Sequence, residues 1–255
     1  MQIAIIIDRE KKLQFVYNTI TCLLMKKWLI GITFIGVVSF ACHFAFSSLG
    51  YNPSDDGFIL AGAKRILFGE IPHRDFITIR PFLPYLLWAP VVAISGDSVY
   101  WVSRFLVWIQ FATIAWMSVL IAEKILKKSF SFFEQISFAL FAFLLPAHNF
   151  PLMAWYSIDA VFLSIIGIWF ALCTNTKGKL LGYFLIGTTA LARQNFLLLG
   201  PFVLFIIGDY KQLKYWVATL SPLFAMGIFL LIVGALHDAL LQMTAHTELV
   251  TYGFL

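Results

Sequence analysis

Two adjacent carboxylates, Asp55 and Asp56, open a polar segment that directly follows the first long apolar run of the chain. An aspartate in this position commonly caps a helix and interacts favourably with its dipole, which explains one of the two. Two adjacent carboxylates repel each other, so the pair needs a cation, a donor on a substrate or a raised pKa to offset the repulsion. The pair is therefore the first candidate for chemistry in this sequence.

Further charged residues follow in the same polar segment, within Gly69-Glu-Ile-Pro-His-Arg-Asp-Phe and Arg80-Pro-Phe-Leu-Pro-Tyr. Arginine suits phosphate, because its planar guanidinium donates two parallel hydrogen bonds. Anchoring to lipid headgroups is the alternative role for each arginine. The candidates for phosphate binding are the arginines of this segment and of a later polar hinge: Arg74, Arg80 and Arg193.

The composition indicates the environment of these residues. Of the 255 residues, 61% are apolar and 12% are charged, whereas soluble domains average about 45–50% apolar and about 25% charged. The 27 phenylalanines and 8 tryptophans exclude intrinsic disorder. The basic residues are scattered, which argues against nucleic acid as a partner, and the three cysteines form no disulfide or metal-ligand pattern. The sequence therefore predicts a multi-pass membrane protein.

The apolar runs predict an all-α fold, a polytopic membrane helix bundle with about five full spans. A spanning helix needs about 20 residues, and the runs near this length are 28–49, 100–122, 130–147, 154–173 and 213–236. Residues 81–94 hold three prolines and are too short to cross, which favours a juxtamembrane or re-entrant helix. Two shorter runs, 180–192 and 196–207, predict a pair of short helices that meet at the polar hinge Arg193-Gln194-Asn195.

The lysines set the orientation of these spans. Positively charged residues stay on the cytoplasmic side of membranes, and with a cytoplasmic N-terminus only Lys64 of the twelve lysines falls outside. The outer side then receives the loop 50–98, the Arg193 hinge and all five histidines. This pattern predicts a multi-pass protein of the cell membrane, most simply a bacterial inner membrane. Met25-Lys26-Lys27 is typical of a natural start, so we interpret residues 1–24 as a cytoplasmic extension of a transmembrane domain over 25–255.

The polar segment itself contains a predicted amphipathic helix. Residues 58–66 carry apolar side chains at helical spacing, with Lys64 and Arg65 on another face. Such a helix is suited to the headgroup layer of a membrane. Because Asp55 and Asp56 directly precede it, the sequence places the acidic pair at the membrane surface.

The outer loop resembles the first loop of glycosyltransferases of the GT-C type that use lipid-phosphate sugars, such as protein mannosyltransferases and lipid A aminoarabinose transferases. The residues that carry the resemblance are Asp55-Asp56-Gly57, the run Gly69 to Phe76, and Arg80-Pro81 to Pro84-Tyr85, with Tyr156-Ser-Ile-Asp159 and Ala192-Arg193-Gln194 further on. The second acid is Asp where the family more often has Glu, and His73 replaces an aromatic residue. Since the family's chains are usually longer, the resemblance implies an N-terminal part that is truncated at its C-terminus.

The resemblance implies a membrane glycosyltransferase that moves a sugar from a polyprenyl-phosphate donor to a glycan, lipid or protein acceptor on the outer (periplasmic or lumenal) face. Asp55 would be the catalytic base and Asp56 would hold the acceptor or a divalent cation, although no metal-ligand set is readable. The implied substrate-binding residues are Asp75, Arg74, Arg80, Asp159 and Arg193. A non-catalytic membrane scaffold or an inactive fragment is the alternative; a small transporter is disfavoured, because midplane charges and internal repeats are lacking.

Overall fold

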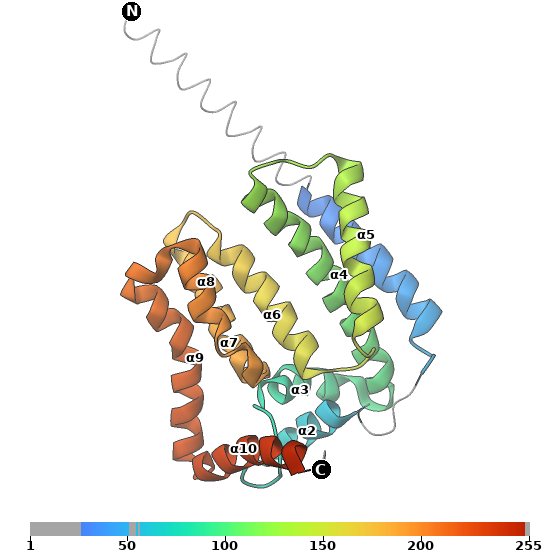
Figure 1. Cartoon of the computed structure of the whole chain (residues 1–255). Helices are drawn as coiled ribbons and strands as arrows, with labels where there is room; N and C mark the ends of the chain where they lie inside the picture. Colours follow the sequence, from blue (N-terminus) through green and yellow to red (C-terminus); the bar gives the residue numbers. More distant parts are fainter. Residues whose placement is uncertain (1–26, 51–54, 56, 253–255) are drawn as a thin grey trace, which may run out of the picture.

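The computed structural model describes residues 27–50, 55 and 57–252, and over these residues the chain is largely helical (Figure 1). The first helix covers Lys27–Phe46. It is followed by α2 Phe58–Leu67, α3 Leu83–Ser95, α4 Val99–Leu126, α5 Phe132–Asn149, α6 Tyr156–Ala171, α7 Thr176–Ala192, α8 Leu199–Ile207, α9 Leu213–Ile232 and α10 Leu236–Tyr252. The described ranges contain no strand, only an isolated bridge between Pro72 and Phe76. The all-α prediction is confirmed.

Three helical segments in the described ranges are long and apolar enough to cross a membrane: Lys27–Phe46, Leu83–Leu126 and Leu213–Ile232. Two further apolar helices, Tyr156–Ala171 and Gln194–Ile207, are shorter. These lengths are compatible with a membrane protein, whereas the count of five spans stays a prediction. The piece predicted at 81–94 forms α3, which continues through a 3-10 turn into α4, so that together they make one 44-residue helical run.

The connections between helices fall at two opposite ends of the molecule (Figure 1). One end holds the α4–α5, α6–α7 and α8–α9 connections and the start of the first helix. We call it the lysine end, after Lys27, Lys124, Lys127, Lys128, Lys177, Lys179, Lys211 and Lys214. The other end holds α2, the α5–α6 connection and α10, and we call it the arginine end, after Arg74, Arg80 and Arg193. The two sets of cations are separated as predicted, and which end faces the cytoplasm stays a prediction.

The main core forms around α4. Its Val107, Phe111 and Trp116 are at most 1% exposed and belong to one apolar cluster with residues of the first helix, α3 and α6. A smaller cluster joins α7, α8 and α9 around Tyr183 and Leu204. The segments of the arginine end thus connect helices of both clusters.

Glycines let α7 approach both of its neighbours. A Cβ atom at Gly182 would lie 2.3 Å from the backbone nitrogen of Ala171 in α6, and one at Gly187 would lie 1.8 Å from the carbonyl oxygen of Thr219 in α9. Close approach over small residues is a common mode of helix packing in membranes. The predicted hinge is confirmed, since α7 ends at Ala192 and the chain turns before α8. The packing of α7 therefore fixes where Arg193 stands.

α2 occupies the segment predicted as an amphipathic helix, but its apolar face has a protein partner. Ile59 and Ala63 are completely buried, and a Cβ atom at Gly62 would lie 2.7 Å from the ring of Tyr85 in α3. Phe68, directly after the helix, is 74% exposed. The apolar face thus packs on α3, and the end of α2 is what remains for contact with a headgroup layer.

Candidate functional site

Arg80 lies at the arginine end, against the start of α6. Its guanidinium carbon is 5.3 Å from the ring centre of Trp155 and 5.0 Å from that of Tyr156. Aromatic faces attract a cation but leave its charge uncompensated. One guanidinium nitrogen, Nη1, is buried and has no hydrogen-bond partner in the described part of the chain. Arg80 is therefore a positioned cation with a donor left for a ligand.

Arg193 brings a second positive charge close to the first. It follows α7 in an extended conformation, and its backbone N–H donates to the Thr189 carbonyl at 3.0 Å. Burial lowers the pKa of Arg193, and the positive charge of Arg80 lowers it further. Among the described residues, neither arginine has a carboxylate partner. Two half-buried cations without a counter-charge favour the binding of an anion between them.

A chain of hydroxyl groups fixes the aromatic surface beneath Arg80. Thr78 Oγ1 donates to the Arg80 carbonyl at 3.0 Å and lies 2.9 Å from the Tyr85 hydroxyl, which in turn contacts the Tyr156 hydroxyl. Since Thr78 has one hydroxyl proton, Tyr85 donates to Thr78 and Tyr156 donates to Tyr85. All three side chains are at most 2% exposed. The sequence analysis missed this network, which joins the loop, α3 and α6.

Asp55 stands at the start of α2, the helix whose Phe58 packs on the same aromatic surface. Its carbonyl accepts the Phe58 N–H at 3.1 Å, and Gly57 between them takes a left-handed conformation (φ 93°) that begins the helix. The ring centre of Phe58 is 6.5 Å from that of Tyr156, the residue on which Arg80 rests. Asp55 is therefore three residues from a direct contact of the arginine site. Asp56, the other half of the acidic pair, lies outside the described residues.

Arg74 and Asp75 bind each other. Arg74 Nε donates to Asp75 Oδ1 at 2.9 Å, and Arg74 Nη2 donates to Oδ2 at 3.0 Å. Oδ2 also accepts the Ile71 N–H at 2.8 Å, and these hydrogen bonds hold the pKa of the Asp75 carboxyl below its usual value. Both residues are predicted to bind substrate; in the structure they form an ion pair with each other and stabilise the loop.

The loop is also held by α10, a contact that the sequence analysis missed. Gln242 Nε2 donates to the His73 carbonyl at 2.9 Å, and Gln242 Oε1 accepts the Thr78 N–H at 3.0 Å. His73 takes a left-handed backbone conformation with φ 70°, unusual for a residue with a side chain. No local signal marks Gln242, because its partners lie more than 160 residues earlier.

Asp159 lies inside the helix bundle and is 1% exposed. Its Oδ2 accepts the indole N–H of Trp88 at 3.0 Å, and its Oδ1 accepts the side-chain amide of Gln110 at 2.8 Å. The carboxyl group thereby connects α6 with α3 and α4. Of the predicted substrate-binding residues, it is the one most enclosed by protein.

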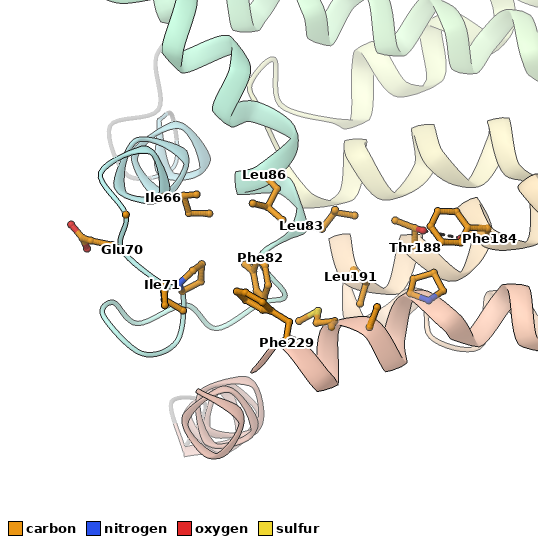
Figure 2. A pocket seen from close by; sticks show the side chains of 15 residues that line it. Ile66, Glu70, Ile71, Phe82, Leu83, Leu86, Phe184, Thr188, Leu191 and Phe229 are labelled. Atoms are coloured by element: carbon orange, nitrogen blue, oxygen red, sulfur yellow. Dashed lines mark hydrogen bonds between the residues drawn. The ribbon is translucent and has the colours of Figure 1, made fainter. Parts of the chain in front are cut away.

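An apolar groove of about 570 Å³ runs between α2, α3, α7 and α9 (Figure 2). Side chains from all four helices point into it, including Ile66, Leu86, Phe184 and Phe229 (Figure 2). Thr188, a polar residue in the wall, donates its hydroxyl to the Phe184 carbonyl at 2.8 Å, so that its polarity is satisfied. Phe82 and Leu83 of the wall follow Arg80 closely in the chain, and Leu191 comes two residues before Arg193. Residues close in sequence to both arginines therefore contribute to the wall of the groove.

The described residues contain no group of three or more His, Cys, Asp or Glu side chains able to hold a metal ion. Comparisons with protein-family models, with curated proteins and with solved structures gave no match. The chemistry of the site therefore has to be inferred from its own geometry.

Proposed function

We propose that this chain is a membrane glycosyltransferase that takes its sugar from a polyprenyl-phosphate donor. The observation that supports this most directly is the pair Arg80 and Arg193, which has no carboxylate partner among the described residues, together with an apolar groove of about 570 Å³ whose wall includes sequence neighbours of both. A ligand that satisfies both features has an anionic head and a long apolar tail. A polyprenyl phosphate is such a ligand.

The groove and the arginines divide the recognition of the donor. The groove walls are almost wholly apolar, so they gain free energy from contact with a hydrocarbon chain and none from a soluble sugar nucleotide. Arg80 offers its free Nη1 donor to the phosphate, and Arg193 adds charge. The arrangement selects for a phosphate that is covalently attached to lipid.

The transfer step requires a base and a stabilised leaving group. In the proposed reaction Asp55 takes the proton of the acceptor hydroxyl, the hydroxyl oxygen bonds to the anomeric carbon, and the bond from that carbon to the phosphate oxygen breaks. The phosphate leaves with the electron pair, and the two arginines stabilise its negative charge. Asp56 would hold the acceptor or a divalent cation. The acceptor is a glycan, a lipid or a protein on the same side.

The orientation of the chain belongs to the same proposal. With five spans and a cytoplasmic N-terminus, the arginine end faces outward and the lysine end faces the cytoplasm, as in a bacterial inner membrane. Single cysteines at positions 177 and 193, in a chain whose native cysteines are replaced, test this with an impermeant thiol reagent on intact cells. Labelling at position 193 alone is expected. Labelling at 177 alone would reverse the orientation and remove the site from the outer face.

A non-catalytic scaffold is the second candidate, and a specific observation favours it. Three predicted site residues already have partners within the protein. Arg74 and Asp75 form an ion pair with each other, and Asp159 accepts hydrogen bonds from Trp88 and Gln110. A scaffold needs no lipid phosphate. Binding of the full chain to dodecaprenyl phosphate and to dodecaprenol, which lacks the phosphate, separates the two. The enzyme proposal requires the phosphate to strengthen binding, and equal binding would contradict it.

A further inference from the structure

A second hollow, of about 300 Å³, lies at the lysine end, away from the arginine site. It is formed by the start of the first helix, the end of α4, the α4–α5 connection and Trp169 near the end of α6. Four lysines line it against one glutamate, which leaves a net charge of +3: Lys27, Lys124, Lys127, Lys128 and Glu123. The hollow therefore concentrates positive charge on residues that have no role in the proposed transfer reaction.

Glu123 compensates only one of these lysines. Its Oε2 accepts from Lys27 Nζ at 2.8 Å, and its Oε1 accepts from the Phe130 N–H at 2.7 Å and from the Gln135 amide at 3.1 Å. With both oxygens occupied and 9% exposure, this carboxylate holds the first helix, α4 and α5 together. Lys27 also donates to Ser129 Oγ at 3.1 Å, which leaves the Ser129 hydroxyl proton free to donate.

Aromatic rings form the apolar side of the hollow. Lys124 Nζ lies 4.3 Å from the ring centre of Trp169 and donates to its carbonyl at 3.2 Å. Trp28 meets Trp169 edge to face, with ring centres 5.3 Å apart. Lys124 is thus held by an aromatic ring and, among the residues that the structure describes, has no carboxylate partner, in the same way as Arg80 at the opposite end. Paired tryptophans are typical of the depth at which lipid headgroups lie.

Lys127 provides a second, independent observation. It ends α4 in the left-handed conformation with φ 51°, a position where glycine is favoured because a Cβ atom strains the backbone. Among the described residues it has no ion-pair partner. Its neighbour Lys128 reaches Glu134 at 3.4 Å on the surface. Lys127 is exposed at this strained position, so its ammonium group, which is unpaired among the described residues, is accessible to a ligand.

We propose that this hollow binds a phosphate-bearing anion of the size of a lipid headgroup. Lys124, Lys127 and the Ser129 hydroxyl donate to the phosphate oxygens, and Trp28 and Trp169 contact the glycerol portion. The same chemistry is available from a phospholipid of the membrane face at which the lysine end lies or from a soluble phosphate ester. The site is independent of the glycosyl transfer proposed above.

Native mass spectrometry of the detergent-solubilised full chain, titrated with phosphatidylglycerol or phosphatidylcholine, tests the proposal. Phosphatidylglycerol should bind more tightly, and Lys127→Gln should weaken it by about five-fold, the contribution of one lysine at an anionic surface. Lys127→Gly should weaken it equally while raising the unfolding temperature, because glycine relieves the strain. Lys177→Gln is the matched control, since it removes one exposed lysine from the same end but outside the hollow.

Two results would overturn the site. If Lys177→Gln lost as much phosphatidylglycerol binding as Lys127→Gln, the lipid would respond to the overall surface charge and not to this hollow. If Lys127→Gly bound phosphatidylglycerol as tightly as the wild type, Lys127 would have no role in binding the ligand. Glycerol 3-phosphate added as a competitor identifies the source. If glycerol 3-phosphate displaces the lipid from the wild type, the site is assigned to soluble phosphate esters. If it does not, the site is assigned to membrane lipid. Either outcome supports a phosphate site, provided that the Lys127 variants bind more weakly as stated.

Discussion

At the lysine end, Lys27 meets the carboxylate of Glu123 at 2.8 Å, whereas at the arginine end the Arg80 guanidinium lies over the rings of Trp155 and Tyr156 and has no carboxylate partner in the described part of the chain. Glu123 also accepts hydrogen bonds from the α4–α5 connection and from α5, so that its pair with Lys27 joins three helices. Within the described ranges, Nη1 of Arg80 makes no hydrogen bond that would connect two segments. A cation with a protein counter-charge contributes to the fold, and a cation on an aromatic surface remains available.

The same comparison divides residues within each end. Arg74 resembles Lys27, because Asp75 neutralises it, and Lys124 resembles Arg80, because the Trp169 ring supports it without neutralising it. Charge alone therefore does not distinguish a binding residue from a structural one in this protein. We propose that the nearest partner does so: a carboxylate marks a structural cation, and an aromatic ring marks a cation available for binding. The predictions below test this distinction.

The largest effect is expected from Asp55→Asn. Asparagine keeps the size and the hydrogen bonding but cannot accept the acceptor's proton, so sugar transfer should fall by about two to four orders of magnitude. Binding of the donor lipid should be unchanged, because the proposal assigns the phosphate to Arg80 and Arg193. The measurement is transfer from a radiolabelled polyprenyl-phosphate sugar, with Asp97→Asn, an exposed acid at the start of the run into α4, as control. Wild-type transfer by Asp55→Asn would exclude Asp55 as the base of the transfer step.

Glu123→Ala should produce the largest loss of stability. It removes three hydrogen bonds and leaves Lys27 without a counter-charge, and because Lys27 is one quarter exposed (25%), the cost is about 2–3 kcal/mol rather than that of a fully buried pair. Urea unfolding in detergent measures it. Glu134→Ala removes the exposed partner of Lys128 and the capping hydrogen bond from the Ser131 N–H, and should cost less, about 1 kcal/mol. Equal losses from the two variants would mean that the buried network does not join the helices as described.

Arg80→Ala should show the reverse pattern, with little change in stability and weaker donor binding. A hydrogen bond to a charged group contributes about 1.5–3 kcal/mol, so the Kd for dodecaprenyl phosphate should rise by roughly 10- to 100-fold. Arg80→Lys should rescue only part of this loss, since lysine lacks the planar fork. Arg74→Ala is the control with a neutralised arginine. If Arg74→Ala weakened donor binding as much as Arg80→Ala, the distinction between paired and unpaired cations would fail.

Local sequence signals were sufficient for part of this molecule. Charged residues that interrupt apolar runs predicted the turn after Ala192 and the separation of lysines from arginines, and helical spacing predicted α2. The suitability of arginine for phosphate indicated Arg80 and Arg193, and in the structure the charge of Arg80 adds to burial in lowering the pKa of Arg193. Features that depend on residue type and near neighbours could be predicted in this way.

The remaining features depend on contacts between distant segments. The partners of Asp159 lie 71 and 49 residues away along the chain, so nothing near Asp159 shows that its carboxyl is occupied. The groove needs α2, α3, α7 and α9 together, and apolar residues on each helix look the same whether they face lipid or a cavity. The family resemblance implied that Asp75 binds substrate, and nothing in the sequence showed that its neighbour Arg74 is its partner. Pairing depends on side-chain direction, which spacing along an irregular loop does not define.

The smallest expected effect is the change in unfolding temperature on replacing Asp75. This acid neutralises Arg74 at the arginine end, as Glu123 neutralises Lys27 at the lysine end. Hydrogen bonds from Arg74 and from the Ile71 N–H lower the pKa of Asp75 from its ordinary value of 3.8. Its contribution to stability is therefore complete above pH 3.8 and is lost as the pH falls through the lower pKa of the folded protein. Unfolding temperatures of the wild type and Asp75→Asn, compared from neutral pH down to about pH 3, should converge over this range. The difference at neutral pH should be small and should shrink in high salt, because the pair is exposed and screened. Parallel pH profiles for the two proteins would show that the carboxylate does not hold the loop, and Arg74 would then become available as a third cation for the donor phosphate.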